Sequence, residues 1–422
     1  MSGIFGSCDV LLPKSRNGDL GSVFAVIACD QFTGEADFWQ RYEELVGDKV
    51  SALHLILPEA FLKDAEERIP RINQAMNEYQ DKYTELFPKS LIYLRRKQSD
   101  GRMRCGIVGA VDLEHYDFSD NSFSLVRPTE KTVSERIPPR VAIRKNAPLE
   151  LSHIMLLLDD KSKTVIEPLE TEYSSFERLY DIELMQNAGH MEGYLISKEH
   201  IERIENLLSA YAERSSCESA CKNEYSPLLF AVGDGNHSLA TAKTIYESAK
   251  LEYGEGALRM PCRYALCELV NLHSEALDFE PIYRTVTCPS KETLESLKIT
   301  LKKEADIQSG SEKPYSLTLI SEGEELEISV AKPEKKLPVA FVQTVLDKFC
   351  AEAPECEIDY IHGEDSVRKL ASAQNTLGIL FEGMHKSDLF PAVMKDGVLP
   401  RKTFSMGHAL DKRHYFEARK IK

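Results

Sequence analysis

The chain has 422 residues, of which 42% are hydrophobic and 28% are charged, a composition typical of folded globular proteins. Lys and Arg number 52 against 68 Asp and Glu, and the net charge of -16 argues against general attraction to nucleic acid or anionic membranes. The length predicts two or three packed units. The expected partner is a small-molecule substrate, and the oligomeric state stays open.

The sequence carries no recognisable targeting or membrane segment. No basic stretch followed by an apolar run opens the chain, and nowhere do about 18 apolar residues follow one another. The ten cysteines form no CxxC pair. We therefore expect a cytoplasmic protein with reduced thiols, and no cluster has a spacing that assigns a metal site.

Strand-like and helix-like segments alternate through the first 288 residues, which predicts an α/β domain with a mixed sheet. A tight Asp100-Gly101 turn predicts a hairpin between its flanking strands. The stretch HIMLLLDDKSKTVIEPL, residues 153–169, repeats this hairpin pattern with its turn at 159–162, and two helical segments are expected after it, up to about Ser215. The other expected elements, in chain order, are a strand over 23–28, a helix over 33–47, a buried strand over 52–57 and a long helix over 58–87.

A basic segment over 124–148 concentrates arginines in an otherwise acidic chain. Arginine binds anions through two parallel hydrogen bonds, so Arg127, with Glu130 and Thr132 nearby, fits an ordered substrate loop. A solvated basic loop explains the same pattern equally well.

The stretch LLFAVGDGNHSLATAK, residues 228–243, predicts a strand that ends abruptly before a helix. Gly233 and Gly235 can adopt backbone angles closed to other residues, and Asp234 or Asn236 can cap the helix. The first-turn N–H groups of a helix form a ready site for phosphate or carboxylate. The spacing matches neither GxxxxGK[ST] nor GxGxxG, so a capped turn without a ligand remains the alternative.

The character of the sequence changes after the segment NLHSEALDFEPIYR, which contains His273 and Arg284. A helix, a polar hairpin, a second helix and a short strand predict a separate α+β unit over 289–375. The last stretch, 376–422, contains Arg401 and Lys402 and is expected to return to the main domain.

Several long blocks in the same order resemble the domain-of-unknown-function 1015 family, among them VIACDQFTGEADFW, VGDGNHSLATAK and LHSEALDFEPIYR. The DGNH element also resembles a signature of the ParB/sulfiredoxin-like fold, which includes an enzyme that phosphorylates free serine. The resemblance implies ParB/sulfiredoxin-like elements in the larger domain and a nucleotide phosphate at the helix N-terminus. Asn236 and Ser238 stand where the signature has a histidine and an arginine, whereas His237 is retained. Arg127, Arg284 or Arg401 would have to supply the missing cation.

These features predict phosphoryl transfer to a small metabolite, such as serine or a related amino or hydroxy acid, with ATP or ADP and Mg²⁺. The expected catalytic groups are Asp30, Glu130, Asp234 and His237. The expected substrate or phosphate ligands are Arg127, Thr132, Gly233, Gly235, Asn236, Ser238, His273, Arg284, Arg401 and Lys402. Two alternatives use the same anion pocket: a non-catalytic sensor of a nucleotide or phosphorylated metabolite, and a phosphatase or other hydrolase.

Overall fold

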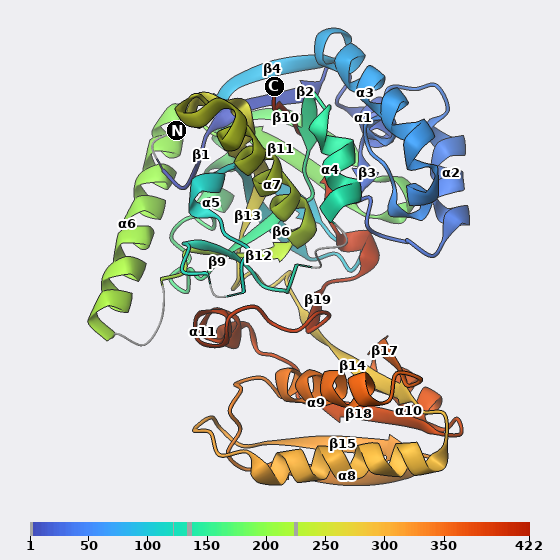
Figure 1. Ribbon diagram of the computed structural model, residues 1–422. Coiled ribbons are helices and arrows are strands. Elements are labelled where there is room, and N and C mark those ends of the chain that lie inside the picture. The colour runs from blue at the N-terminus through green and yellow to red at the C-terminus, as the bar shows by residue number, and fades with distance from the viewer. Residues whose placement is uncertain (1–2, 121, 133–136, 223–226) are drawn as a thin grey trace. The chain divides into compact units, whose positions relative to one another are not determined.

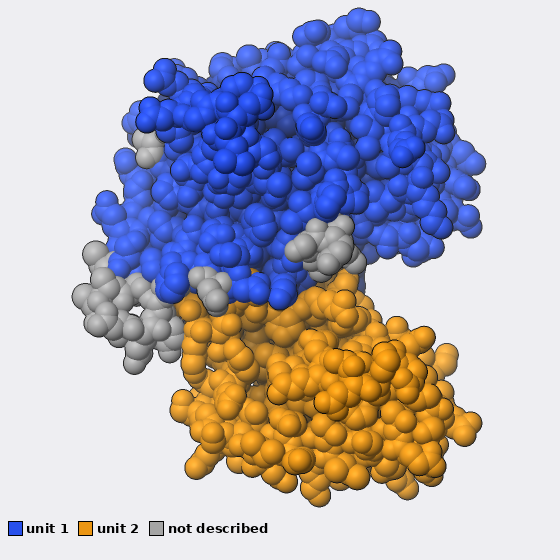
Figure 2. All heavy atoms as spheres, viewed as in Figure 1, with its two compact units in different colours: residues 1–277, 408–422 blue, residues 278–407 orange. Residues whose placement is uncertain are grey.

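The computed structural model of the chain describes residues 3–120, 122–132, 137–222 and 227–422, with the backbone alone over 217–222. The chain divides into two compact units (Figures 1 and 2). Unit 1 comprises residues 1–277 and 408–422, and unit 2 comprises residues 278–407. No helix in the described ranges is both long enough and apolar enough to cross a membrane.

Unit 1 is built on a mixed sheet that has nine strands among the described residues (Figure 1). In sheet order the strands are β10 (Glu177–Glu183), β11 (His190–Leu195), β5 (Ile92–Lys97), β6 (Met103–Asp112), β13 (Tyr264–Asn271), β9 (Met155–Leu158), β12 (Phe230–Asp234) and β7 (Val126–Pro128), while β1 (Phe5–Gly6) pairs with β6. The pairs β7–β12 and β9–β13 are parallel, and the remaining pairs are antiparallel. The expected mixed α/β class is confirmed.

Alternation of side chains along the strands gives the sheet two apolar faces, because successive residues point to opposite sides. In β5, Ile92 and Leu94 belong to one hydrophobic cluster and Tyr93 to the other. The first cluster packs against α1 (Gly18–Phe24), α2 (Ala36–Val46) and α3 (Ala65–Lys82). The second packs against α5 (Leu169–Glu172), α6 (Lys198–Lys222) and α7 (Asn236–Tyr253). Another helix, α4 (Ile137–Lys145), packs beside α7.

The C-terminal segment of unit 1 forms strand pairs with the N-terminal part of the same unit. Strand β20 (His414–Tyr415) pairs with β3 (Val26–Ile27). A second small sheet has the order β4 (Thr84–Ser90), β2 (Cys8–Pro13), β21 (Ala418–Lys420) and β8 (Leu149–Leu151). The last strand of the chain is therefore an interior strand of this sheet.

Unit 2 is an α+β unit around a sheet of six strands. In sheet order these are β16 (Glu324–Val330), β15 (Tyr315–Ser321), β18 (Thr376–Phe381), β14 (Phe279–Thr287) and β17 (Glu357–His362), while β19 (Phe404–Met406) pairs with β14. Its helices are α8 (Lys291–Ile307), α9 (Pro338–Glu352), α10 (Glu364–Ala371) and α11 (Lys386–Asp396). The smaller unit was expected to span residues 289–375. Because β14 and β18 lie inside its sheet, it spans residues 278–407 instead. Only residues 408–422 return to unit 1.

Three local expectations need correction. The apolar run at 52–57 forms a 3-10 helix, Ala52–Leu55, because the Ser51 side chain accepts a hydrogen bond from the Leu53 N–H and caps it. The run at 23–28 is not one strand: its first two residues end α1, and β3 is only two residues long. The two helical segments expected before Ser215 are instead the β10–β11 hairpin followed by α6. The hairpin around Asp100-Gly101 is confirmed as β5–β6.

Candidate functional site

The GDGNHS turn joins β12 to α7 at one end of the main sheet. Gly235 lies between them with φ of +75°, and no side chain caps the helix. The Asp234 carboxylate accepts a hydrogen bond from the Gly235 N–H at 2.8 Å, so the expected capping by Asp234 or Asn236 is replaced by this tighter turn. The amide N–H groups of the first turn of α7 have no partner within the helix, because a helix leaves these groups unpaired. They and the helix dipole favour an anion at this point.

His153 lies directly beside this turn. Residue Met155, at the start of β9, pairs with Asp234 at the end of β12, which brings the segment before β9 to the turn. A β-carbon on Gly235 would lie 2.9 Å from the Ile154 Cα and 3.4 Å from the His153 ring. Only glycine permits this close approach, so the chain conformation at the turn and the position of the imidazole depend on each other.

The His153 imidazole links three further side chains. Its Nε2 lies 3.5 Å from Oδ2 of Asp30 and 3.4 Å from Oγ of Ser238, the third residue of α7. Its Nδ1 lies 2.6 Å from the phenol oxygen of Tyr415. A carboxylate, a buried imidazole and a helix-start hydroxyl are thus brought together from positions 30, 153 and 238.

The Asp30–His153 pair is charged. Burial acts to raise the pKa of Asp30, but the charge and hydrogen bond of His153 outweigh it and hold that pKa well below its usual range. Burial acts to lower the pKa of His153, and the attraction of Asp30 overcomes it and raises that pKa. Both shifts favour the charged pair, an imidazolium next to a carboxylate. Lys412 adds a positive charge 3.4 Å from Oδ2 of Asp234.

The hydrogen bonds behind His153 agree with an imidazolium. The Tyr415 hydroxyl donates its proton to Sγ of Cys29 at 3.1 Å and accepts from the Cys29 N–H at 3.3 Å. Its oxygen can then only accept from His153 Nδ1, so that nitrogen carries a proton. Burial raises the pKa of the Cys29 thiol to about 12, which makes Cys29 a hydrogen-bond partner rather than a nucleophile.

A cavity of about 130 Å³ opens beside these groups. His153, Tyr415, Ser238 and Thr241 provide polar groups in its wall, and most of its other lining is aliphatic. Two ion pairs, Arg140–Glu59 and Arg144–Glu150, also border the cavity. The aliphatic lining residues are Leu55, Ile56, Leu57, Leu62, Met76, Ile143, Ala147, Leu149, Leu151 and Ile154. An engineered apolar cavity of comparable size, about 150 Å³, binds benzene, so this one suits a group of about one ring.

The other residues expected near the turn have different positions. Asn236 accepts a hydrogen bond at Oδ1 from the Thr129 N–H, which ties the end of β7 to the turn, and Glu130 and Thr132 follow in the same loop. His237 is the second residue of α7 and is half-buried. Gly233 lies within β12.

Arg127 does not point toward the turn. Its guanidinium donates to the carbonyl oxygens of Ser122 and Pro227, which precede the parallel strands β7 and β12, whereas the turn follows β12. Burial lowers the pKa of Arg127 to about 10. Arg127 was expected to be a phosphate ligand. Its guanidinium instead links the segments that precede β7 and β12.

His273 also lies away from the turn. Its Nε2 is 2.6 Å from Oδ1 of Asp159, and these two residues follow the ends of β13 and β9. Asp234 pairs with the start of β9, so His273 lies at the opposite end of the strands.

The remaining expected ligands belong to unit 2. Arg284 is fully buried there, where its guanidinium donates to Gln343 and to the carbonyl oxygens of Arg401 and Lys402. Arg401 donates to the Tyr360 hydroxyl at 2.6 Å. These contacts give Arg284 a structural role in unit 2 and correct its assignment as a phosphate ligand.

Sequence reasoning missed His153, Tyr415 and Lys412. His153 directly precedes an apolar run in ELSHIMLLLDD, and a histidine at the start of a buried strand is a usable signal. Tyr415 and Lys412 lie in a polar C-terminal segment whose return to unit 1 was expected, but no local pattern places them at Asp30.

Fold and site together define a two-unit mixed α/β protein with a candidate small-molecule site at a strand-to-helix turn of its larger unit. The chain belongs to the family described as "Protein of unknown function (DUF1015)", which matches residues 13–349. A search of curated proteins gave no match.

Several solved structures are similar to the chain. A mutant free serine kinase in complex with AMP is 10% identical, with a TM-score of 0.39, over 74% of this chain and 90% of that chain. A conserved hypothetical protein from Pyrococcus furiosus is 11% identical, with a TM-score of 0.35, over 74% and 94%. A C-terminally truncated SbnI from Staphylococcus aureus is 10% identical, with a TM-score of 0.35, over 71% and 82%.

Proposed function

We propose that the chain is a phosphoryl-transfer enzyme whose substrate is a small metabolite with a hydroxyl group, in the class of amino and hydroxy acids. The phosphate donor is ATP or ADP with Mg²⁺. The observation that carries the proposal is the contact of His153 with both Asp30 and Ser238 at the uncapped start of α7. It combines an anion site, a carboxylate and a fixed positive charge beside one cavity.

The start of α7 holds the phosphate in this proposal. A helix directs the amide N–H groups of its first turn outward from its end, and Asn236 and Ser238, with its hydroxyl, lie in this turn of α7. His153, which is positively charged, lies within hydrogen-bonding distance of that hydroxyl and supplies the cation that the turn itself lacks. Phosphoryl transfer depends mainly on positioning and electrostatic stabilisation, and these groups provide both.

Asp30 accepts the proton of the substrate hydroxyl. A carboxylate has this role in kinases, where the proton leaves as the phosphorus–oxygen bond forms. The pKa of Asp30 is low, so the group is ionised at neutral pH and available as an acceptor. His153 and Gln31 both hydrogen-bond to the carboxylate and fix its orientation.

Asp234 would hold the magnesium ion. Mg²⁺ is usually held by one or two carboxylates together with substrate phosphates, and Asp234, at the turn before α7, supplies an oxygen of this kind. When bound, the ion would neutralise charge on the phosphates. Lys412 pairs with Asp234 and orients it.

The experiment is a turnover assay of the full-length protein with a panel of amino and hydroxy acids and either nucleotide, with the phosphorylated product detected by mass spectrometry. Asp30→Asn and His153→Gln should abolish turnover. His200→Gln is the matched control, because His200 also contacts a carboxylate, Glu172, but lies on α6. A rise in melting temperature with nucleotide but no product would contradict the proposal and favour the sensor, and undiminished turnover in Asp30→Asn would remove Asp30 from the mechanism.

A further inference from the structure

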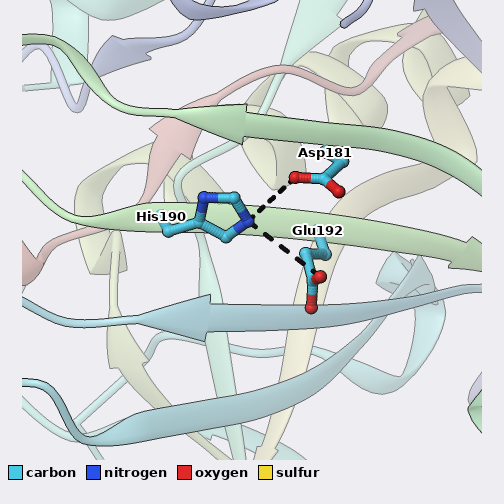
Figure 3. A group of neighbouring side chains, drawn as sticks. All are labelled: Asp181, His190 and Glu192. Atoms are coloured by element: carbon cyan, nitrogen blue, oxygen red, sulfur yellow. Dashed lines mark ion pairs between the residues drawn. The ribbon is translucent and has the colours of Figure 1, made fainter. Parts of the chain in front are cut away.

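The β10–β11 hairpin places four ionisable side chains on one face of the main sheet. In the antiparallel register Asp181 faces Glu192, and Glu183 faces His190. The alternate residues Tyr180, Ile182 and Met191 are buried in the core on the other face. Figure 3 shows one ring nitrogen of His190 facing the carboxylates of both Asp181 and Glu192.

The spacing of three of these groups suits one metal ion. Nε2 of His190 lies 3.0 Å from Oδ1 of Asp181 and 4.0 Å from Oε1 of Glu192, and all three atoms lie within 4.8 Å of one another. Zinc bonds to histidine nitrogen and carboxylate oxygen at about 2.0–2.2 Å, so two ligands of one ion lie roughly 3–4 Å apart. The three side chains are half-buried, which leaves a side open to solvent.

A second layer of contacts holds each of the three groups by its other polar atom. Oδ2 of Asp181 accepts from Arg178 at 2.5 Å, and Oε2 of Glu192 accepts from Arg95 at 2.5 Å. Nδ1 of His190 lies 2.9 Å from Oε1 of Glu183. Metal-binding histidines and carboxylates are commonly oriented in this way, with the far atom hydrogen-bonded and the near atom directed at the metal.

The charges around His190 also favour a cation. Both of its nitrogens face carboxylates, Asp181 at 3.0 Å and Glu183 at 2.9 Å. The surrounding network has four carboxylates, Asp181, Glu183, Glu192 and Glu170, and two guanidiniums, Arg95 and Arg178. A divalent cation at Nε2 balances the excess negative charge.

We propose that Asp181, His190 and Glu192 bind a divalent transition-metal ion of the zinc class through Oδ1, Nε2 and Oε1, with water completing the coordination. The strands β10 and β11 form one edge of the sheet, and β12 and β7 form the other. The metal site is therefore separate from the phosphoryl-transfer site, and neither proposal depends on the other.

The test is calorimetric titration of Zn²⁺ into the full-length protein after treatment with a chelator, followed by Co²⁺ absorption spectroscopy. We expect one equivalent of Zn²⁺, and a Co²⁺ spectrum without the thiolate charge-transfer band that a cysteine ligand would produce. His190→Gln and Asp181→Asn should each abolish this binding. Glu183→Gln, which removes only the charge behind Nδ1, should weaken it by about ten- to a hundredfold.

His200→Gln again serves as the matched control, because His200 contacts Glu172 next to Arg203, and no second carboxylate among the described residues lies within reach of a shared ion. It should bind Zn²⁺ as the parent protein does. Absence of Zn²⁺ uptake by the parent protein would overturn the proposal. Unchanged uptake by a folded His190→Gln or Asp181→Asn variant, verified by circular dichroism, would overturn it as well.

Discussion

His153 Nδ1 lies 2.6 Å from the phenol oxygen of Tyr415, although 262 residues separate the two along the chain. Tyr415 pairs with Val26 in the β3–β20 ladder, and Val26 lies only four residues before Asp30. Strand β20 therefore positions both members of the Asp30–His153 pair. It positions Asp30 through backbone pairing with β3, and it positions His153 through the Tyr415 hydroxyl.

Tyr415→Phe should destabilise unit 1. The variant keeps the ring but leaves the Nδ1 proton of His153 buried without an acceptor, which costs about 1–3 kcal/mol. The free energy of unfolding, measured in urea, should fall by that amount. Tyr253→Phe, at an exposed position of α7, should change it by less than about 0.5 kcal/mol. Equal stabilities of Tyr415→Phe and the parent protein would show that the hydroxyl does not hold the imidazole.

Asp30→Asn should reduce stability in a pH-dependent way. Asp30 forms an ion pair with His153 that stabilises the folded protein. Because the pKa of His153 is raised, this stabilisation is complete below the ordinary histidine pKa of about 6.5 and is lost as the pH rises through the raised value. The lowered pKa of Asp30 means that it is present above about 3.9 and lost as the pH falls through the lowered value. The difference in unfolding free energy between parent and variant should thus be largest between about pH 4 and 6.5 and shrink at higher pH. Measuring the unfolding free energy of both proteins from acidic to alkaline pH tests this prediction. If the difference between them does not vary with pH, the two groups do not form an ion pair.

Sequence reasoning succeeded where local chemistry determines the structure. The strand-to-helix turn at Gly233–Ser238 and the hairpin at Asp100-Gly101 follow from turn residues and apolar runs, and both are present. The β10–β11 hairpin shows the opposite case. Polar and apolar residues alternate along its two strands with the period of a strand, but helical segments were expected before Ser215.

The composition of the candidate site could not be derived in the same way. The chain brings Asp30, His153, Ser238 and Tyr415 together only through the pairings of β3 with β20 and β9 with β12. Such long-range register is not encoded in any single stretch. Arg127 and Arg284 illustrate the converse, because arginines that suit an anion are used by the fold to bind backbone carbonyls.

Gly235→Ala should cost more than the same change at a glycine with free space. Both Gly235 and Gly101 have positive φ, of +75° and +88°, so alanine is strained at either position by about 1 kcal/mol or more. Only at Gly235 would the new methyl group meet backbone, at 2.9 Å from the Ile154 Cα, whereas nothing lies within 4 Å of it at Gly101. Chemical denaturation should show a loss for Gly235→Ala that exceeds the loss for Gly101→Ala. Equal losses would mean that the turn relaxes without moving His153.

Glu268→Gln should be the most destabilising of these changes. Glu268 is fully buried in β13, and its carboxylate faces Arg104 at 3.3 Å and Arg413 at 2.9 Å, so it joins the sheet to the C-terminal segment. Removing one partner of a buried ion pair leaves uncompensated charge and costs about 3–5 kcal/mol. Glu67→Gln, in the exposed pair with Arg71 on α3, should cost less than about 0.5 kcal/mol. Thermal unfolding of the two variants tests this, and a Glu268→Gln protein as stable as Glu67→Gln would show that the C-terminal segment is held by its strand pairing alone.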